Sequence, residues 1–207
     1  LNGDGARILE RSNSEAWFDF GEGGFVRQLA WADPDDAFLV YDADGDGTVS
    51  SPEELSFIGY LEGASTDLEG LAAFDSNGDG AISSGDVEWD KFSIWQDANS
   101  NGVTDDGELY ALSSTNIASV GLASDGMMEN YGDGSRVFGR GTFTLTDNTT
   151  HDLADVALSV SRVAVGVNEE VGSVAFRSDA LGRFDVALTD NSLNVSLDTD
   201  EIKAFIE

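Results

Sequence analysis

Three short clusters of Asp and Gly interrupt the N-terminal half of the chain, and apolar stretches compatible with helices flank each of them. The clusters lie at 42–47, 75–80 and 97–102. After the first cluster, Pro52 and Glu53 are typical of a helix start, and the spacing of apolar residues from Leu55 to Leu61 predicts one buried helix face. Residues 87–95 have the length of one further helix, which would couple the second and third clusters mechanically.

The pattern changes at about residue 115. From there, short runs alternate β-branched or apolar residues with polar ones and are separated by Gly, Asn and Asp, which predicts strands and turns. These runs lie at 116–124, 136–146 and 152–160. Residues 166–197 resemble further strands, and residues 200–207 a short terminal helix.

The first Asp/Gly cluster matches the EF-hand calcium loop at every position. Its ligand positions 1, 3, 5, 7, 9 and 12 are filled by Asp42, Asp44, Asp46, Thr48 (through its backbone carbonyl), Ser50 and Glu53. Gly47 stands at position 6, where the loop turns sharply. This spacing directs alternate oxygens onto one hard cation, which takes about six to eight of them. The alternative, a plain Asp/Gly-rich turn, would have to match all these positions by chance.

The second and third clusters match the same pattern less completely. The second loop offers Asp75, Asn77, Asp79, Ala81 (backbone carbonyl), Ser83 and Asp86. The third offers Asp97, Asn99, Asn101, Val103 (backbone carbonyl), Asp105 and Glu108. Position 12 of the second loop is the shorter Asp86, which leaves an oxygen to water or missing, and the third loop has fewer charges near its start.

The loops and strands together predict an α+β fold. EF-hand-like calcium loops with short helices would form the N-terminal half, and antiparallel β strands would form the C-terminal half. We expect two parts: residues 1–165 as a calcium-binding module, and residues 166–207 as a β-rich extension that ends in a short helix. The cofactor expected from the loops is Ca²⁺.

Composition and charge argue against several classes of partner. The 207 residues contain 40 Asp and Glu against 10 Lys and Arg, a net charge of −30 that opposes binding to nucleic-acid phosphates and to anionic membranes. No apolar run approaches the roughly 20 residues of a membrane-spanning helix. Catalytic motifs are sparse, and the one histidine, His151, lies in a polar turn. Asp33–Pro34 is a chemically weak bond, because the Asp carboxylate can attack its own carbonyl and expel the proline amine, but an acidic turn without a cleavage role is the favoured interpretation.

The order of the segments resembles that of the calcium-dependent self-processing module of RTX (repeats-in-toxin) proteins over roughly residues 1–160. The segments that carry the resemblance are Leu1–Gly5, Trp17–Phe20, Leu29–Trp31, Asp35–Gly47, Glu53–Phe57, Leu71–Gly80, Phe92–Asp97, Asn101–Val103, Gly107–Leu109 and Ile117–Leu122. The resemblance implies a module that calcium folds and that cleaves an Asp-Pro bond at its N-terminal edge, with an isopeptide crosslink to a lysine as a second outcome. In this protein that bond either lies upstream of Leu1 or has been lost, and its role is not assigned to Asp33–Pro34.

We therefore expect a calcium-binding module of a large secreted bacterial protein, exported in one step and folded by Ca²⁺ outside the cell. Autocatalytic Asp-Pro cleavage is one alternative. A peptide- or glycan-binding adhesin module is another, for which the exposed-loop residues Met127, Met128 and Tyr131 are the only signal. The partners expected are calcium ions, neighbouring domains of a larger chain and a protein or glycan surface, without nucleic acid and without membrane insertion.

Overall fold

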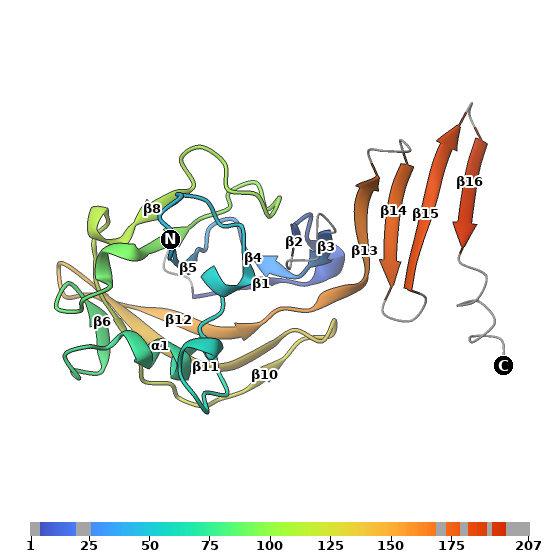
Figure 1. The fold of residues 1–207 in the computed structure, drawn as a ribbon. Coiled ribbons are helices and arrows are strands. Elements are labelled where there is room, and N and C mark those ends of the chain that lie inside the picture. Colours follow the sequence, from blue (N-terminus) through green and yellow to red (C-terminus); the bar gives the residue numbers. More distant parts are fainter. Residues whose placement is uncertain (1–4, 20–25, 169–172, 179–181, 190–191, 198–207) are drawn as a thin grey trace.

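The computed structural model describes residues 5–19, 26–168, 173–178, 182–189 and 192–197. In these ranges the chain is built mainly of antiparallel strands, and its one α-helix, α1, spans only Asp67–Leu71 (Figure 1). The α+β prediction with EF-hand-like loops between helices is therefore wrong. Strands occur in both halves of the described chain, and each of the three Asp/Gly loops adjoins or contains a strand.

Single turns of 3₁₀ helix replace the helix predicted after the first loop. η2 (Pro52–Glu54) ends after one turn and is followed by η3 (Ile58–Tyr60), where Ile58 is exposed and not buried as predicted. The reason is a distant acceptor: Asp67 Oδ1 accepts the backbone N–H groups of Phe57 and Ile58 at 2.6 and 3.0 Å. These N–H groups are satisfied outside any α-helix, so the helix does not continue.

The helix predicted for residues 87–95 is also absent from the described chain. Its first part is the 3₁₀ turn η5 (Trp89–Lys91), and its second part is the strand β7 (Phe92–Trp95). β7 lies between β5 (Phe38–Tyr41) and β8 (Leu109–Ala111) in a three-stranded sheet. Pairing with two distant strands thus overrides the local tendency of this segment to form a helix.

Three further antiparallel sheets complete the described residues. A five-stranded sheet consists of β10 (Glu129–Asn130), β11 (Arg136–Leu145), β9 (Ile117–Gly121) and β6 (Ala81–Ser83), with β12 (Thr150–Ala157) paired to β11. A six-stranded sheet has the order β16 (Ser192–Leu197), β15 (Gly182–Thr189), β14 (Ser173–Ser178), β13 (Val160–Asn168), β3 (Val26–Leu29) and β2 (Trp17–Asp19). β1 (Ile8–Leu9) pairs with β4 (Trp31–Ala32).

The strands predicted after residue 115 are confirmed. The three alternating runs contain β9, β11 and β12, and the described parts of residues 166–197 are strands. The helix predicted for residues 200–207 lies outside the described residues. The remaining short turns are η1 (Arg11–Asn13), η4 (Ala72–Phe74) and η6 (Leu112–Ser114).

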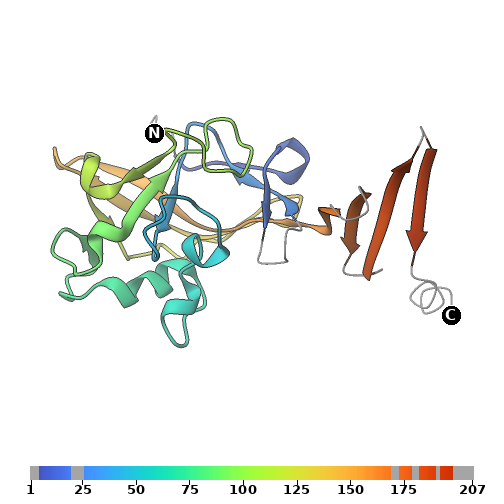
Figure 2. The same cartoon turned by 45° about the horizontal axis from the view of Figure 1, so that its top comes forward.

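Two apolar clusters form the core. The first is rich in aromatic residues and lies around Tyr41, Phe74 and Phe92, whereas the second gathers around Trp31 and Trp95. The paired strands β11 and β12 run from the loop region toward the N-terminal strands β2 and β3 (Figure 1 and Figure 2). The described helices are all too short to cross a membrane.

Candidate metal centre

The first loop brings four carboxylates together. Oxygen atoms of Asp42, Asp44, Asp46 and Glu54 all lie within 4.8 Å of one another. β5 delivers Asp42 directly into the loop, and Gly45 and Gly47 take positive φ angles of 74° that let the backbone turn around the acids. The N–H groups of both glycines donate to the Asp42 carboxylate at 2.7 and 3.1 Å.

The fourth carboxylate of this group is Glu54, not the predicted Glu53. Glu54 is only 6% exposed, and its Oε2 accepts the backbone N–H groups of Ser50 and Ser51, each at 2.9 Å. Its Oε1 is buried and has no hydrogen-bond partner among the residues that the structure describes. Glu53 is exposed and stays outside the group. A signal for Glu54 was present in the sequence, because Ser51-Pro52-Glu53-Glu54 has the spacing of a capping box.

Thr48 and Ser50, the other predicted ligands of the first loop, lie at its exposed side. The Thr48 backbone N–H and hydroxyl both donate to Asp46 Oδ1 at 2.8 Å. Asp44 in turn accepts the N–H of Asp46 at 3.3 Å. These local turns fix the loop backbone so that its acids face one another.

The second loop has the same internal bonds, but the buried acid that accepts the N–H of position 9, here called the closing acid, is Asp86 and not a glutamate. Asp75 accepts the N–H groups of positions 4, 5 and 6, Asn77 accepts that of Asp79, and Asp79 accepts that of Ala81. Asp86 is buried and accepts three N–H groups at 2.8 to 3.3 Å, including that of Ser83. Burial alone would raise the pKa of Asp86, but these hydrogen bonds outweigh it and hold the pKa below its usual range.

The third loop repeats this arrangement between β7 and β8. Asp97 accepts the N–H groups of Asn101 and Gly102, and the buried Glu108 accepts those of Ala98 and Asp105 at 3.1 Å. The side-chain amides of Asn99 and Asn101 donate to Asp105 Oδ2 at 2.8 and 2.9 Å. The Val103 N–H donates to Asn101 Oδ1. Ser100 takes a positive φ of 55°, which a residue other than glycine rarely adopts.

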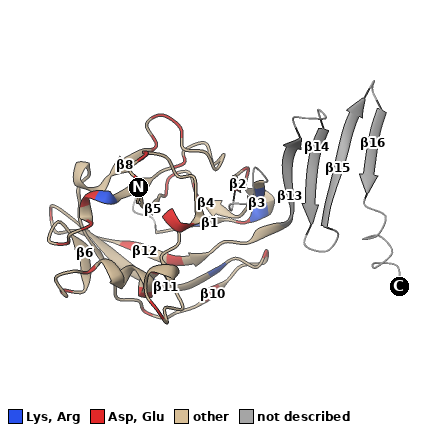
Figure 3. Cartoon of the chain, viewed as in Figure 1, with Lys and Arg blue, Asp and Glu red and all other residues tan. Residues whose placement is uncertain are grey.

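The three loops therefore share one backbone design. In each, the acid at position 1 accepts the N–H of position 6, and a buried acid at position 12 or 13 accepts the N–H of position 9. Acidic residues are spread widely over the described loops, and basic residues are few (Figure 3). Oxygen donors of this kind suit a hard cation such as Ca²⁺.

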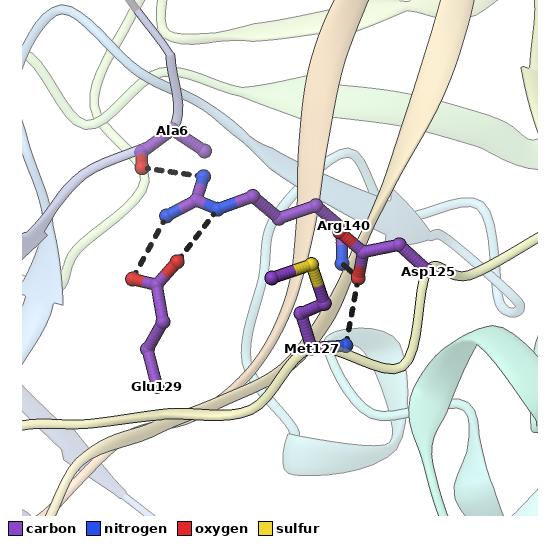
Figure 4. Close-up of polar contacts among 5 residues, drawn as sticks. All are labelled: Ala6, Asp125, Met127, Glu129 and Arg140. Atoms are coloured by element: carbon purple, nitrogen blue, oxygen red, sulfur yellow. Dashed lines mark hydrogen bonds and ion pairs between the residues drawn. The ribbon is translucent and has the colours of Figure 1, made fainter.

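A separate polar cluster holds the segment around Ala6, near the start of the described residues (Figure 4). Arg140 pairs with both carboxylate oxygens of Glu129 at 3.1 and 3.2 Å, and its Nη1 donates to the carbonyl of Ala6 at 3.4 Å. Asp125 accepts the backbone N–H groups of Arg140 and Met127 at 2.8 and 2.9 Å. The ion pair raises the pKa of Arg140 and lowers that of Glu129. These bonds hold Ala6 against the β10–β11 hairpin.

Comparison with known proteins defines the class. The chain belongs to the SPM domain family, whose pattern matches residues 1–159. A particular relative is the iron-regulated protein FrpA of Neisseria meningitidis serogroup C, which is 29% identical over 185 residues. That match covers 87% of this chain but only 17% of FrpA, so the chain corresponds to about a sixth of its relative. The family resemblance inferred from the sequence is confirmed, whereas calcium binding and self-cleavage stay predictions.

Proposed function

We propose that this chain is a calcium-binding module of a larger, secreted RTX-type protein, and that Ca²⁺ orders and stabilises it outside the cell. The observation that carries this proposal is the group formed by Asp42, Asp44, Asp46 and Glu54. Like charges at this separation repel one another, and a divalent cation converts the repulsion into attraction. The chain as a whole carries a net charge of −30, which adds to the repulsion.

The buried oxygen of Glu54 supports the same proposal. A buried carboxylate oxygen without a hydrogen-bond partner is costly, and a cation bound in the loop relieves that cost. Glu54 would then close the first site, as Asp86 and Glu108 would close the second and third.

The position of the loops links binding to folding. The first and third loops extend from the three-stranded sheet, whereas the second leads into β6 of the five-stranded sheet. Cations that bind only the folded loops stabilise the whole arrangement by mass action. We expect the module to be looser where calcium is scarce and compact where it is abundant.

The test is a calcium titration of the EDTA-treated chain, followed by tryptophan fluorescence and by denaturing gel. Trp95 is buried directly before the third loop, and Trp89 is buried after the second, so both report loop ordering. We expect a saturable spectral change and a higher melting temperature, with a weaker response to Mg²⁺ because it demands a tighter octahedral site. No response to calcium in either measurement would contradict the proposal.

A second candidate function is calcium-dependent cleavage at the N-terminal edge. One observation favours it: the third loop contacts the N-terminal strand β2 directly. The N–H of Trp17 donates to the carbonyl of Asn101 at 3.2 Å, and a Cβ on Gly102 would lie 2.6 Å from the Trp17 carbonyl oxygen. Calcium in the third loop would therefore also fix the path of the N-terminal segment, and Arg140 would hold it at Ala6.

The test of this second function uses a longer chain that includes the natural residues upstream of Leu1. If an Asp-Pro bond lies there, calcium should produce two fragments whose new termini are identified by mass spectrometry. The control replaces Asp105 by Ala to weaken the third loop, which should slow cleavage. An intact chain at saturating calcium would exclude the function. Binding of a peptide or glycan surface remains a prediction for which the described residues add only the exposure of Met127 and Met128.

A further inference from the structure

The first and third loops contact each other at matching positions. The backbone N–H of Val49 donates to Thr104 Oγ1 at 2.9 Å in a partly buried site. Val49 is position 8 of the first loop, and Thr104 is position 8 of the third. Neither residue is a predicted ligand, so the bond joins the two loops without occupying a metal site.

A second contact reinforces this link. The indole N–H of Trp31 donates to Asp97 Oδ2 at 2.8 Å, and Asp97, position 1 of the third loop, is 4% exposed. Val49 is 5% exposed and belongs to the same apolar cluster as Trp31 and Trp95. The rings of the two tryptophans are 5.4 Å apart in an edge-to-face arrangement. One packed cluster therefore supports position 8 of the first loop and position 1 of the third.

Among the described residues, the second loop lacks such a hydrogen bond to the third, although Phe74, directly before it, packs against Tyr41, directly before the first loop, with ring centroids 4.6 Å apart. Position 8 of the second loop is Ile82, which is fully buried and pairs with Val120 of β9. Both residues belong to the other apolar cluster, around Phe74 and Phe92. The helix predicted to join the second and third loops is not formed, and its place is taken by η5 and β7.

We infer that the first and third loops bind calcium as a coupled pair, with Thr104 as the positioning residue between them, and that the second loop depends much less on the third. This inference rests on the calcium binding proposed above. The physical route is short: a cation held by Asp105 fixes the adjacent Thr104, whose hydroxyl then holds the Val49 N–H. Val49 is flanked by Thr48 and Ser50, both predicted ligands of the first loop.

The experiment follows each loop separately by NMR. The amide signals of Gly47, Gly80 and Gly102, the position 6 glycines, report the first, second and third loops during a calcium titration. Replacing Asp105 by Ala disables the third loop. We expect the calcium affinity of the first loop to fall about three- to tenfold, the range of one hydrogen bond, and that of the second to change less than about twofold.

Two variants of Thr104 test the route itself. Thr104→Val removes the acceptor at constant volume and should weaken the first loop by a similar factor, whereas Thr104→Ser keeps the hydroxyl and should not. In the Thr104→Val background, Asp105→Ala should no longer affect the first loop. If Thr104→Val does not fold, the Asp105→Ala and Thr104→Ser titrations still decide.

The titrations distinguish a failure of the proposed calcium binding from a failure of the proposed coupling between the first and third loops. If no glycine signal responds to calcium, the proposed function fails. If the signals respond, but Asp105→Ala weakens the first and second loops equally, calcium binding stands and the coupled pair is overturned, because the coupling is then global.

Discussion

The first and second loops begin with the same residue pattern but are closed in different ways. In the first, Glu54 accepts two N–H groups on one oxygen and leaves the other buried without a partner in the described structure. In the second, both oxygens of Asp86 accept N–H groups, and an asparagine replaces one of the acids. The second loop is thus shaped largely by its own chain, whereas the first leaves clustered carboxylates and one buried carboxylate oxygen without a partner in the described residues.

The largest effect expected from this comparison is on calcium affinity in the first loop. Glu54→Gln keeps an acceptor for Ser50 and Ser51 but removes the charge, and it should lower the affinity at least about tenfold. The matched control is Glu53→Gln, at the exposed neighbouring position, which should change the affinity less than about twofold. Calorimetric titration measures both variants. A larger loss for Glu53→Gln would show that Glu53 is the ligand, as simple position counting predicts.

A change of the closing acid in the second loop should act mainly on the free energy of unfolding of the calcium-free chain. Asp86→Asn removes a charged acceptor of several buried N–H groups and should lower the free energy of unfolding by about 1.5–3 kcal/mol in calcium-free urea titrations at pH 7. Because the pKa of Asp86 is lowered in the folded chain, its stabilisation is present above the ordinary pKa and is lost as the pH falls through the folded value. The difference between wild type and variant should therefore shrink on acidification. A constant difference would argue against the ionised carboxylate as the stabilising group.

The smallest effect concerns repulsion within the first loop. Asp44→Asn removes one of the clustered charges and should raise the calcium-free melting temperature by about 2 °C while weakening calcium binding. The gain should fall in high salt, since Asp44 is exposed. Asp90→Asn, at an exposed acid of η5 outside the loops, is the control and should leave the melting temperature nearly unchanged. A lower melting temperature for Asp44→Asn would indicate that its bond to Asp46 outweighs the repulsion.

Local features of this fold were predictable from the sequence, and contacts between distant segments were not. The loop turns follow from side chains that bond to backbone two residues away, and β9, β11 and β12 follow from alternation. The predicted helices are not formed because the first segment is diverted by Asp67, the acceptor of the Phe57 N–H, and the second pairs as β7 with β5, which lies much earlier in the chain. Glu54 was missed because position counting ignored the 3₁₀ turn that begins at Pro52. The bond between Val49 and Thr104 spans 55 residues, and no local pattern marks it.

The contact between Arg140 and Ala6 has a consequence for the order of events as the chain emerges. The two residues are 134 positions apart, and β3 likewise pairs with β13 near the far end of the module. A chain synthesised from its N-terminus cannot complete these contacts until residue 140 and β13 are free to fold, and such distant contacts also slow folding. The earliest residues to appear are therefore secured last, so the N-terminal boundary of the module acquires its final form only when nearly the whole module is present.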